Sequence, residues 1–133
     1  MISVTNTINA SIEKVWEFWT TSKHITKWNN ASPEWHTSFA ENNLTVGKIF
    51  KYTMAAKDGS MSFDFEGTYT NIEKYTAIAY VLDDDRKVQI SFQETENGIE
   101  IIESFDSENE NTEELQKNGW QAILDNFKKY VEQ

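Results

Sequence analysis

Cysteine is absent from the 133-residue chain, and proline occurs only once, as Pro33. Without cysteine there can be no disulfide framework, thiolate nucleophile, iron–sulfur cluster or cysteine-based zinc site. Small secreted domains usually depend on disulfides, so this absence favours a reducing compartment, and we expect a cytoplasmic protein. A chain of this length is typical of one domain, which we expect to span residues 1–133.

Positive charge is also scarce. Twelve Lys and Arg residues stand against 22 Asp and Glu residues, a formal net charge of −10. Nucleic acids and anionic membrane surfaces are bound through clustered positive charge, so we expect neither as the main partner. Residues 1–8 lack the basic start and apolar run of a signal peptide, and no apolar run approaches the roughly 18 residues of a membrane span.

Aromatic residues are abundant by contrast. The chain holds 5 Trp, 5 Tyr and 8 Phe, or 14% of all residues, although only 38% are hydrophobic. Its mean hydropathy is −0.64. An acidic, hydrophilic chain therefore concentrates its apolar area in a few large rings, and their placement decides what the fold can do.

The first third of the chain predicts one strand and two short helices. Residues 2–8 alternate apolar and polar side chains, which indicates a half-buried strand. Ser11 then offers a helix N-cap, and residues 15–19 carry a dense apolar patch. A second short helix is expected over about 21–28, before Pro33 closes the helical section.

The middle of the chain, about residues 35–106, predicts a meander of antiparallel strands. Apolar and polar residues alternate, and the turn sequences Asp58-Gly59 and Asn97-Gly98 predict hairpins. The clearest strands are expected at 48–54, 61–69, 77–82, 87–95 and 99–105.

The last segment predicts one long amphipathic helix of about 19 residues, with apolar side chains at three- and four-residue spacing. Asn111 followed by Glu114 resembles a capping box. Gly119 lies inside the helix, where glycine costs about 1 kcal/mol relative to alanine. We expect this glycine to allow close approach of another segment.

These elements predict an α+β fold: a strand, two short helices, an antiparallel sheet of about six to seven strands, and a long C-terminal helix. A sheet with one apolar face needs cover, and only the last helix is long enough to supply it. The sheet should therefore curl around that helix.

The order of elements and several local patterns resemble the helix-grip proteins of the START and Bet v 1-like (SRPBCC) superfamily. Within it the chain is most similar to the bacterial group related to the C-terminal domain of the activator of Hsp90 ATPase, the Activator of Hsp90 ATPase homolog 1-like family. The resemblance runs from Ile2 to Val131 and rests on residues 8–17, 24–28, 46–54, 58–59, 65–69 and 119–127.

The resemblance implies a cavity between the concave sheet and the long helix. Relatives use this cavity to bind sterols, lipids, flavonoids, hormones or polyketides. Some relatives act as cyclases, and the activator of Hsp90 contacts a chaperone. Fold alone does not decide among these roles, because function depends on the site.

Alternation along the strands and spacing on the helix place a set of rings and apolar side chains on facing surfaces. These side chains either line a ligand pocket or fill a solid core. At about 24 cal/mol per Å³, a dry void of 300 Å³ costs up to roughly 7 kcal/mol, so such a space is either kept for a ligand or filled with rings. Trp28 and Trp35 flank the Pro33 loop and are expected near the entrance or as core anchors. The candidate ligand-binding residues are Trp28, Trp35, Phe50, Tyr52, Met54, Phe63, Phe65, Tyr69, Tyr80, Phe92, Glu103, Trp120, Ile123, Leu124 and Phe127.

Glu103 is the one polar candidate. It alternates in phase with Ile101 and Phe105, so strict period-2 geometry points it to the inner face. A desolvated carboxylate there would have a raised pKa and could serve as an acid, a base or a ligand anchor. The alternative is a bulge or sheet edge that lets Glu103 reach water.

No other catalytic or metal-binding pattern stands out. The two histidines, His24 and His36, lack the spacing of metal ligands, and no Gly-x-Ser-x-Gly motif occurs. We therefore expect no metal, no cofactor and no catalytic residue.

Three functions remain in order of preference. The first is non-catalytic binding of a small hydrophobic or amphipathic molecule of lipid, sterol or polyketide type. The second is a protein-interaction module resembling the Hsp90 activator domain, with a chaperone-like partner, and the third is a cyclase-like or hydrolase-like enzyme. Ligand identity and oligomeric state do not follow from the sequence.

Overall fold

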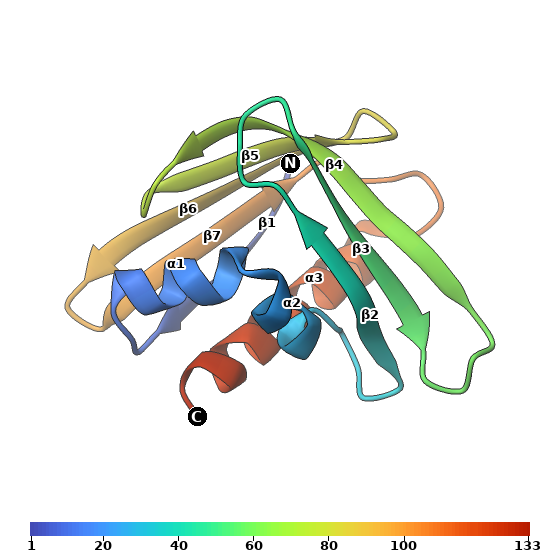
Figure 1. Cartoon of the computed structure of the whole chain (residues 1–133), viewed down its shortest axis with the longest axis horizontal. Coiled ribbons are helices and arrows are strands. Elements are labelled where there is room, and N and C mark those ends of the chain that lie inside the picture. The colour runs from blue at the N-terminus through green and yellow to red at the C-terminus, as the bar shows by residue number, and fades with distance from the viewer.

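The computed structural model describes residues 1–133 and contains one antiparallel sheet of seven strands with three helices (Figure 1). The expected α+β helix-grip architecture is confirmed. In chain order the elements are β1 (Ile2–Ile8), α1 (Ile12–Thr20), α2 (Ser22–Trp28), β2 (Trp35–Asn42), β3 (Ile49–Ala56), β4 (Ser62–Glu73), β5 (Ala77–Leu82), β6 (Lys87–Thr95), β7 (Gly98–Phe105) and α3 (Glu113–Val131).

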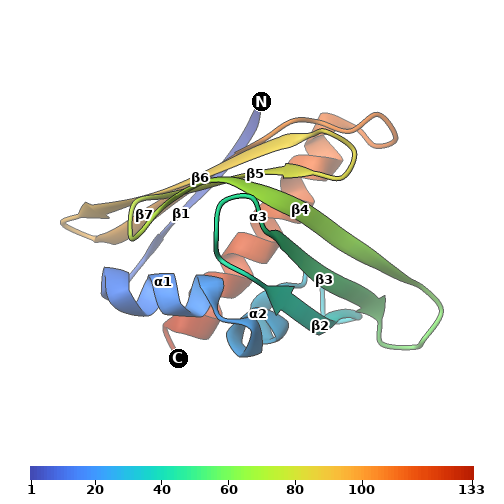
Figure 2. The same ribbon diagram turned by 45° about the horizontal axis from the view of Figure 1, so that its top comes forward.

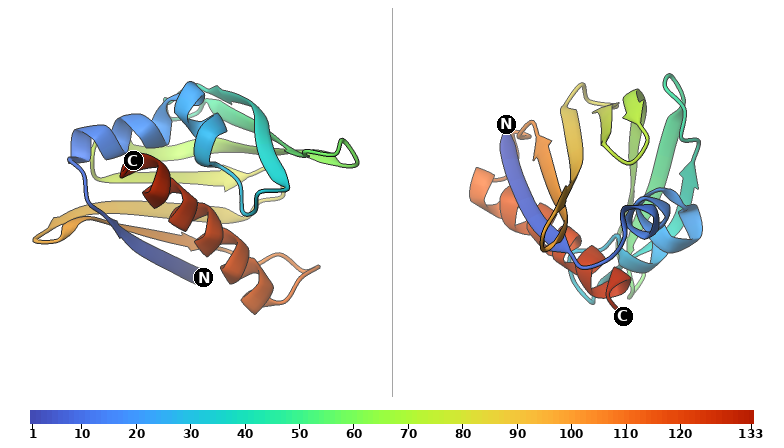
Figure 3. Two further views of the ribbon diagram at one scale, coloured as in Figure 1. Left: turned by 90° about the horizontal axis from the view of Figure 1, so that it is seen from below. Right: turned by 90° about the vertical axis from the view of Figure 1, so that its left-hand side faces the viewer.

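The sheet follows the order β1-β7-β6-β5-β4-β3-β2. Strands β2 to β7 form a meander in which sequence neighbours pair, while β1 crosses over to pair with β7, so that Ile2 lies opposite Phe105. The sheet curves strongly, and all three helices lie on its concave side (Figure 3). The β3–β4 hairpin extends beyond the helices (Figure 2).

Period-2 alternation determines which side chains face the helices. Val88, Ile90 and Phe92 of β6 are buried in turn, and their neighbours are exposed. Strand β7 alternates in the same way, with Ile101 and Phe105 completely buried. The inner faces predicted for these two strands are confirmed.

Helix α3 crosses the sheet diagonally and packs mainly on β1, with further contacts to α1 and α2 (Figure 3). Its N-cap is Thr112, whose hydroxyl accepts a hydrogen bond from the Leu115 N–H at 3.1 Å. The predicted capping box at Asn111 is wrong by one residue, because the Asn111 N–H instead donates to Glu108 Oε1 at 2.7 Å.

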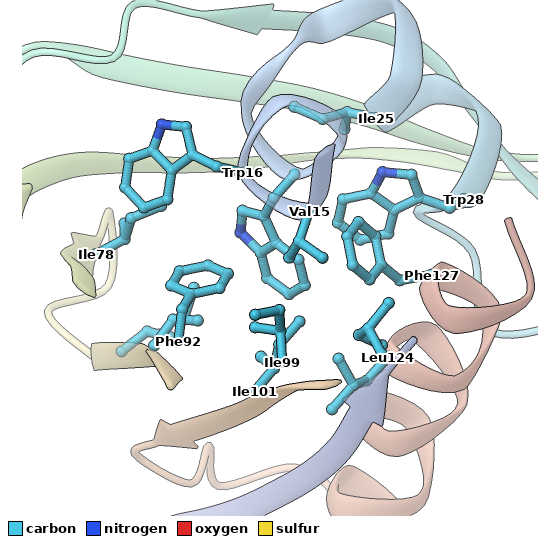
Figure 4. Packing of buried hydrophobic residues seen from close by; sticks show 14 of the residues in the cluster. Val15, Trp16, Ile25, Trp28, Ile78, Phe92, Ile99, Ile101, Leu124 and Phe127 are labelled. Carbon is cyan, nitrogen blue, oxygen red and sulfur yellow. The ribbon is translucent and has the colours of Figure 1, made fainter. Parts of the chain in front are cut away.

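Many of the buried hydrophobic side chains gather where α1, α2 and the second half of α3 meet β6 and β7 (Figure 4). Trp19 packs against Trp28, Phe92 and Phe127, with ring centroids 4.9, 5.7 and 4.8 Å away. We call this region the packed half. It is a solid core of interlocking rings, held by dispersion and by removal of apolar surface from water.

Candidate ligand-binding site

A cavity of about 420 Å³ lies between the concave face of β3 to β5 and the first half of α3, and 15 of its 25 lining residues are hydrophobic. We call this region the hollow half. Its exposed lining residues mark the mouth: Phe63 on β4, which is 51% exposed, and Leu115 on α3, which is 58% exposed. The volume suits a small organic molecule.

Ten of the fifteen candidate residues line this cavity. They come from α2, four strands and α3, which the fold brings together across 95 residues of sequence. These ten are Trp28, Tyr52, Met54, Phe63, Phe65, Tyr69, Tyr80, Glu103, Trp120 and Ile123.

Five candidates do not line it: Trp35, Phe50, Phe92, Leu124 and Phe127. Phe92 and Phe127 belong to the packed half, and Leu124 is also fully buried in the core. Trp35, at the start of β2, packs against the Phe63 ring with centroids 5.8 Å apart. Period-2 spacing correctly gives the face of a strand, but it does not say which part of that face a helix covers.

Phe50 is excluded from the cavity by a glycine. Its ring lies over Gly67 of the neighbouring strand β4, where an added Cβ would come within 2.6 Å of Phe50 Cε2. The ring therefore sinks to the sheet surface and is only 1% exposed. Rings of Tyr52, Phe65 and Tyr80 then surround it at centroid distances of 4.7 to 5.9 Å.

Trp28 does not lie at the entrance. Its side chain is only 4% exposed, and its indole N–H donates to the Phe18 carbonyl at 3.0 Å. It stands at the boundary between the packed half and the cavity. The mouth is formed instead by β4 and the start of α3.

Gly119 is a lining residue that the sequence analysis interpreted differently. The predicted close approach of another segment is wrong, because a Cβ built at Gly119 meets nothing within 4 Å. Instead the missing side chain leaves the cavity open beside Trp120. Glycine weakens a helix, so its presence inside α3 was a sign in the sequence that a reason other than helix stability keeps glycine at this position.

Trp120 joins the two sides of the cavity wall. Its indole stacks on Phe105 of β7 with ring centroids 4.0 Å apart and planes 10° apart. It also meets Phe65 of β4 edge to face, at 6.1 Å. The first half of α3 is thereby fixed opposite the sheet without filling the space between.

Three tyrosines bring hydroxyl groups to the cavity. Tyr69 donates its O–H to Asn42 Oδ1. Burial raises the pKa of Tyr52 and of Tyr80 well above the usual value, and that of Tyr69 to about 12. All three phenols are therefore neutral at physiological pH and can donate or accept hydrogen bonds.

Glu103 is confirmed on the inner face. It pairs in unbroken register with Val4 of β1 and Ile90 of β6, so the alternative of a bulge is wrong. The residue is only 6% exposed and lines the cavity, and its carboxyl group makes no hydrogen bond within the chain. Burial in these apolar surroundings raises the pKa of Glu103 to about 8.

The remaining charged residues of the cavity are acidic except for one. Asp64, Glu66, Asp83 and Glu108 are lining residues, and Arg86 is the single basic one. The Arg86 Nε lies 2.7 Å from Asp84 Oδ2, so its charge is already paired.

The site has the composition of a binding pocket: apolar rings around a few convergent polar groups. Neither histidine lines it; His24 Nδ1 lies 2.7 Å from the Tyr130 hydroxyl at the other end of α3. No group of three or more His, Asp or Glu side chains is arranged to hold a metal ion. None of the helices has the length and apolar character needed to cross a membrane.

Comparison with known proteins agrees with this fold. The family model described as Activator of Hsp90 ATPase homolog 1-like protein matches residues 9–132. The chain belongs to this family. The sequence resemblance to it is thus confirmed, and no curated protein matches the chain.

Two solved structures of similar proteins share both sequence and fold with the chain. The solution structure of the AHSA1-like protein from Aeromonas hydrophila is 46% identical, with a TM-score of 0.93, and the match covers 98% of this chain and 91% of that one. Chr148 from Cytophaga hutchinsonii is 53% identical, with a TM-score of 0.86 and the same coverage.

Protein CV1439 from Chromobacterium violaceum is only 20% identical, yet its TM-score is 0.88 over 99% of this chain and 97% of that one. At this identity the likeness concerns the fold alone. Widely different sequences therefore build the same fold.

Proposed function

We propose that the chain is a single-domain cytoplasmic protein that binds a small hydrophobic or amphipathic molecule in the cavity, without changing it chemically. The observation that carries this proposal is the 420 Å³ cavity itself. Because the cavity has an open mouth, water enters it in the free protein and lies against apolar rings. An apolar occupant that displaces this water gains about 25 cal/mol per Å² of apolar surface removed from water.

The lining supports an amphipathic occupant. Rings from β3, β4, β5 and α3 supply apolar area, while Tyr80 and Glu103 supply polar groups without partners in the chain. In the free protein only water in the cavity can meet these two groups, so a ligand that displaces this water gains affinity and orientation if it makes the same hydrogen bonds. The polar end of the ligand is thereby oriented toward β5 and β7.

A library of lipids, sterols and aromatic compounds tests the proposal by thermal shift and tryptophan fluorescence. Compounds that bind only the folded state raise Tm by mass action. The Gly119→Leu variant, which extends a side chain into the cavity, should abolish the shift. The neighbouring Asn118 does not line the cavity, so Asn118→Leu is the matched control and should bind as the wild type does.

The proposal fails if no compound of a broad library raises Tm in the wild type, or if Gly119→Leu binds as well as Asn118→Leu. Far-UV circular dichroism of both variants shows that each is folded before binding is measured.

A second candidate function is an interaction module like the Hsp90 activator, favoured by family membership and by exposed apolar residues near the β3–β4 hairpin, among them Met61 and Phe63. It predicts a chaperone-like partner whose binding is lost in Met61→Lys and retained in Gly119→Leu. No observation favours the third candidate, a cyclase-like or hydrolase-like enzyme.

A further inference from the structure

We propose that the cavity selects ligands that carry a positively charged nitrogen next to an apolar body, and that the carboxylate of Glu103 is the partner of that nitrogen. This inference rests on the proposed ligand-binding function and names the chemical class of the ligand.

The first argument is the isolation of Glu103. Its side chain is 94% buried, it faces the cavity, and no donor of the chain reaches its carboxyl group. Arg86, the only basic lining residue, is held by Asp84. Buried carboxylates elsewhere in proteins are paired or coordinate a cation. In the free protein only water in the cavity can meet this carboxyl group, so a charged partner can come only from the occupant of the cavity.

The second argument is the ring cage. Phe65 stands at 6.1 Å from Trp120 and 6.4 Å from both Tyr52 and Tyr80, edge to face in each case. Rings from three strands and one helix thus surround a single space. The faces of Trp, Tyr and Phe attract ammonium groups within about 6 Å, and such cages recognise quaternary and methylated amines.

The third argument is the charge around the cavity. Lys51 approaches Asp64 and Glu66 at 3.5 and 3.9 Å, but Asp83 and Glu108 line the cavity without a basic partner, and the whole chain carries −10. This field attracts cations and raises their local concentration. A fatty-acid carboxylate would meet repulsion from these acids, and a neutral ligand gains no Coulomb attraction from them.

Proton balance gives the inference a distinct signature. Burial raises the pKa of Glu103 to about 8, so at pH 7 the group is mostly neutral and must release one proton to the solvent when a cation binds. Affinity for a cation should therefore rise up to tenfold per pH unit below pH 8 and level off above it.

The other groups that face Glu103 do not supply this signature. The phenols of Tyr52, Tyr69 and Tyr80 on β3 to β5 remain protonated up to pH 9, because burial raises the pKa of each. The partners in register on β1 and β6 are Val4 and Ile90, and α3 contributes Gln116 but no ionisable side chain. The charged lining residues are Asp64, Glu66, Asp83, Arg86 and Glu108.

The experiment uses three probes of similar size: phenyltrimethylammonium, its neutral carbon isostere tert-butylbenzene, and the anion phenylacetate. Each is titrated by NMR and calorimetry against the wild type, Glu103→Gln and the control Glu100→Gln at pH 6.5 to 9. We expect the wild type at pH 8.5 to bind the cation at least tenfold more tightly than tert-butylbenzene, and phenylacetate most weakly.

Glu103→Gln should lose the preference for the cation and its pH dependence, while its affinity for tert-butylbenzene stays within about threefold of wild type. Glu100→Gln, on the same strand as Glu103 but on its other face and outside the cavity lining, should retain both. A readout without any variant is proton release: calorimetry in two buffers of different ionisation enthalpy should show nearly one proton released per cation at pH 7.

The outcomes separate the two proposals. If tert-butylbenzene binds as tightly as the cation, if Glu103→Gln keeps the preference, or if no proton is released, the ammonium inference is overturned and ligand binding stands. If only neutral library compounds bind, the result is the same. If neither the probes nor any library compound binds, both proposals fail.

Discussion

The packed half and the hollow half lie side by side on one concave sheet face, and both are lined by aromatic rings. They differ in cover. The packed half lies beneath α1, α2 and the second half of α3. The hollow half is covered mainly by the first half of α3, with Gln116 and Gly119 toward the cavity and Trp19 and Trp28 only at its boundary. Ring content alone therefore does not make a core solid; the number of helices over the rings does.

The difference also concerns polar groups. The rings of the packed half meet each other, while the hollow half contains Tyr52, Tyr69, Tyr80 and Glu103. Polar groups that do not stabilise a fold are retained where a binding site needs them. We therefore expect stability to depend on one half and binding on the other.

The largest expected effect is truncation of a ring in the packed half. The Phe127 ring is fully buried against Trp19 and Trp28. Phe127→Ala should therefore lower the free energy of unfolding by about 3–5 kcal/mol. The matched change Phe65→Ala in the hollow half should cost only about 1–2 kcal/mol, because its ring already borders open space. Urea denaturation measures both. Equal losses would mean that the two halves do not differ in packing.

The next largest effect is the pH dependence of the free energy of unfolding that results from the burial of Glu103. Its pKa is about 8 in the folded chain and near 4.5 when exposed, so the unfolded state loses its proton first. The contribution of the protonated Glu103 carboxyl group to the free energy of unfolding is therefore complete below pH 4.5. It is lost as pH rises to 8, at up to about 1.4 kcal/mol per pH unit.

Because the cavity admits water, we expect a total loss on the order of 3 kcal/mol. Glu103→Gln should remove this slope and be the more stable protein at pH 8.5. Denaturant midpoints of both proteins from pH 4.5 to 9 provide the measurement. A wild-type stability that stays level over this range would show that Glu103 is not desolvated.

Two glycines of the hollow half should respond in opposite ways to alanine. Gly67→Ala should cost about 1–3 kcal/mol, because the new Cβ displaces the Phe50 ring from the sheet. Gly119→Ala should stabilise the chain by about 0.5–1 kcal/mol through helix propensity, because the methyl group enters open space. Thermal unfolding compares the two, and a loss of stability in Gly119→Ala would show that the position is crowded.

The smallest expected effect tests where the cavity-bordering helix begins. Thr112→Ala should cost about 1 kcal/mol, because the Leu115 N–H loses its acceptor. Asn111→Ala should change stability by only a few tenths of a kcal/mol, since Gln116 bonds to the backbone carbonyl of Asn111 rather than to its side chain. Denaturant midpoints of the pair decide between these two N-caps; equal losses would contradict the assignment of Thr112.

Sequence could predict the face of each side chain wherever a strand is regular. Strands β6 and β7 have an unbroken register, so counting by two placed Ile90, Phe92 and Glu103 correctly. It could not predict how the helices share that face. Phe92 and Tyr80 both point inward, but Phe92 packs against Trp16 of α1 and only Tyr80 borders the cavity. The path of α1 and α2 over the sheet depends on contacts distant in sequence, which a local pattern does not show.

Local competition explains the other errors. At the start of α3, Asn111 and Thr112 are both good caps, and the outcome depends on the side chain of Glu108, which takes the Asn111 N–H. At Gly119 the sequence showed a cost in helix propensity but not the structural reason for having glycine there. Close approach and empty space both favour a residue without a Cβ, and only the arrangement of α3 over the sheet separates them.

The pairing of β1 with β7 sets an order for folding. Residue 2 meets residue 105 across the longest loop in the sheet, whereas each hairpin from β2 to β7 closes locally. Local contacts form faster than distant ones, because short loops lose less entropy on closure. Helix α3 packs mainly on β1, and β1 can pair only once β7 is in place, so the helical wall of the cavity forms late in folding.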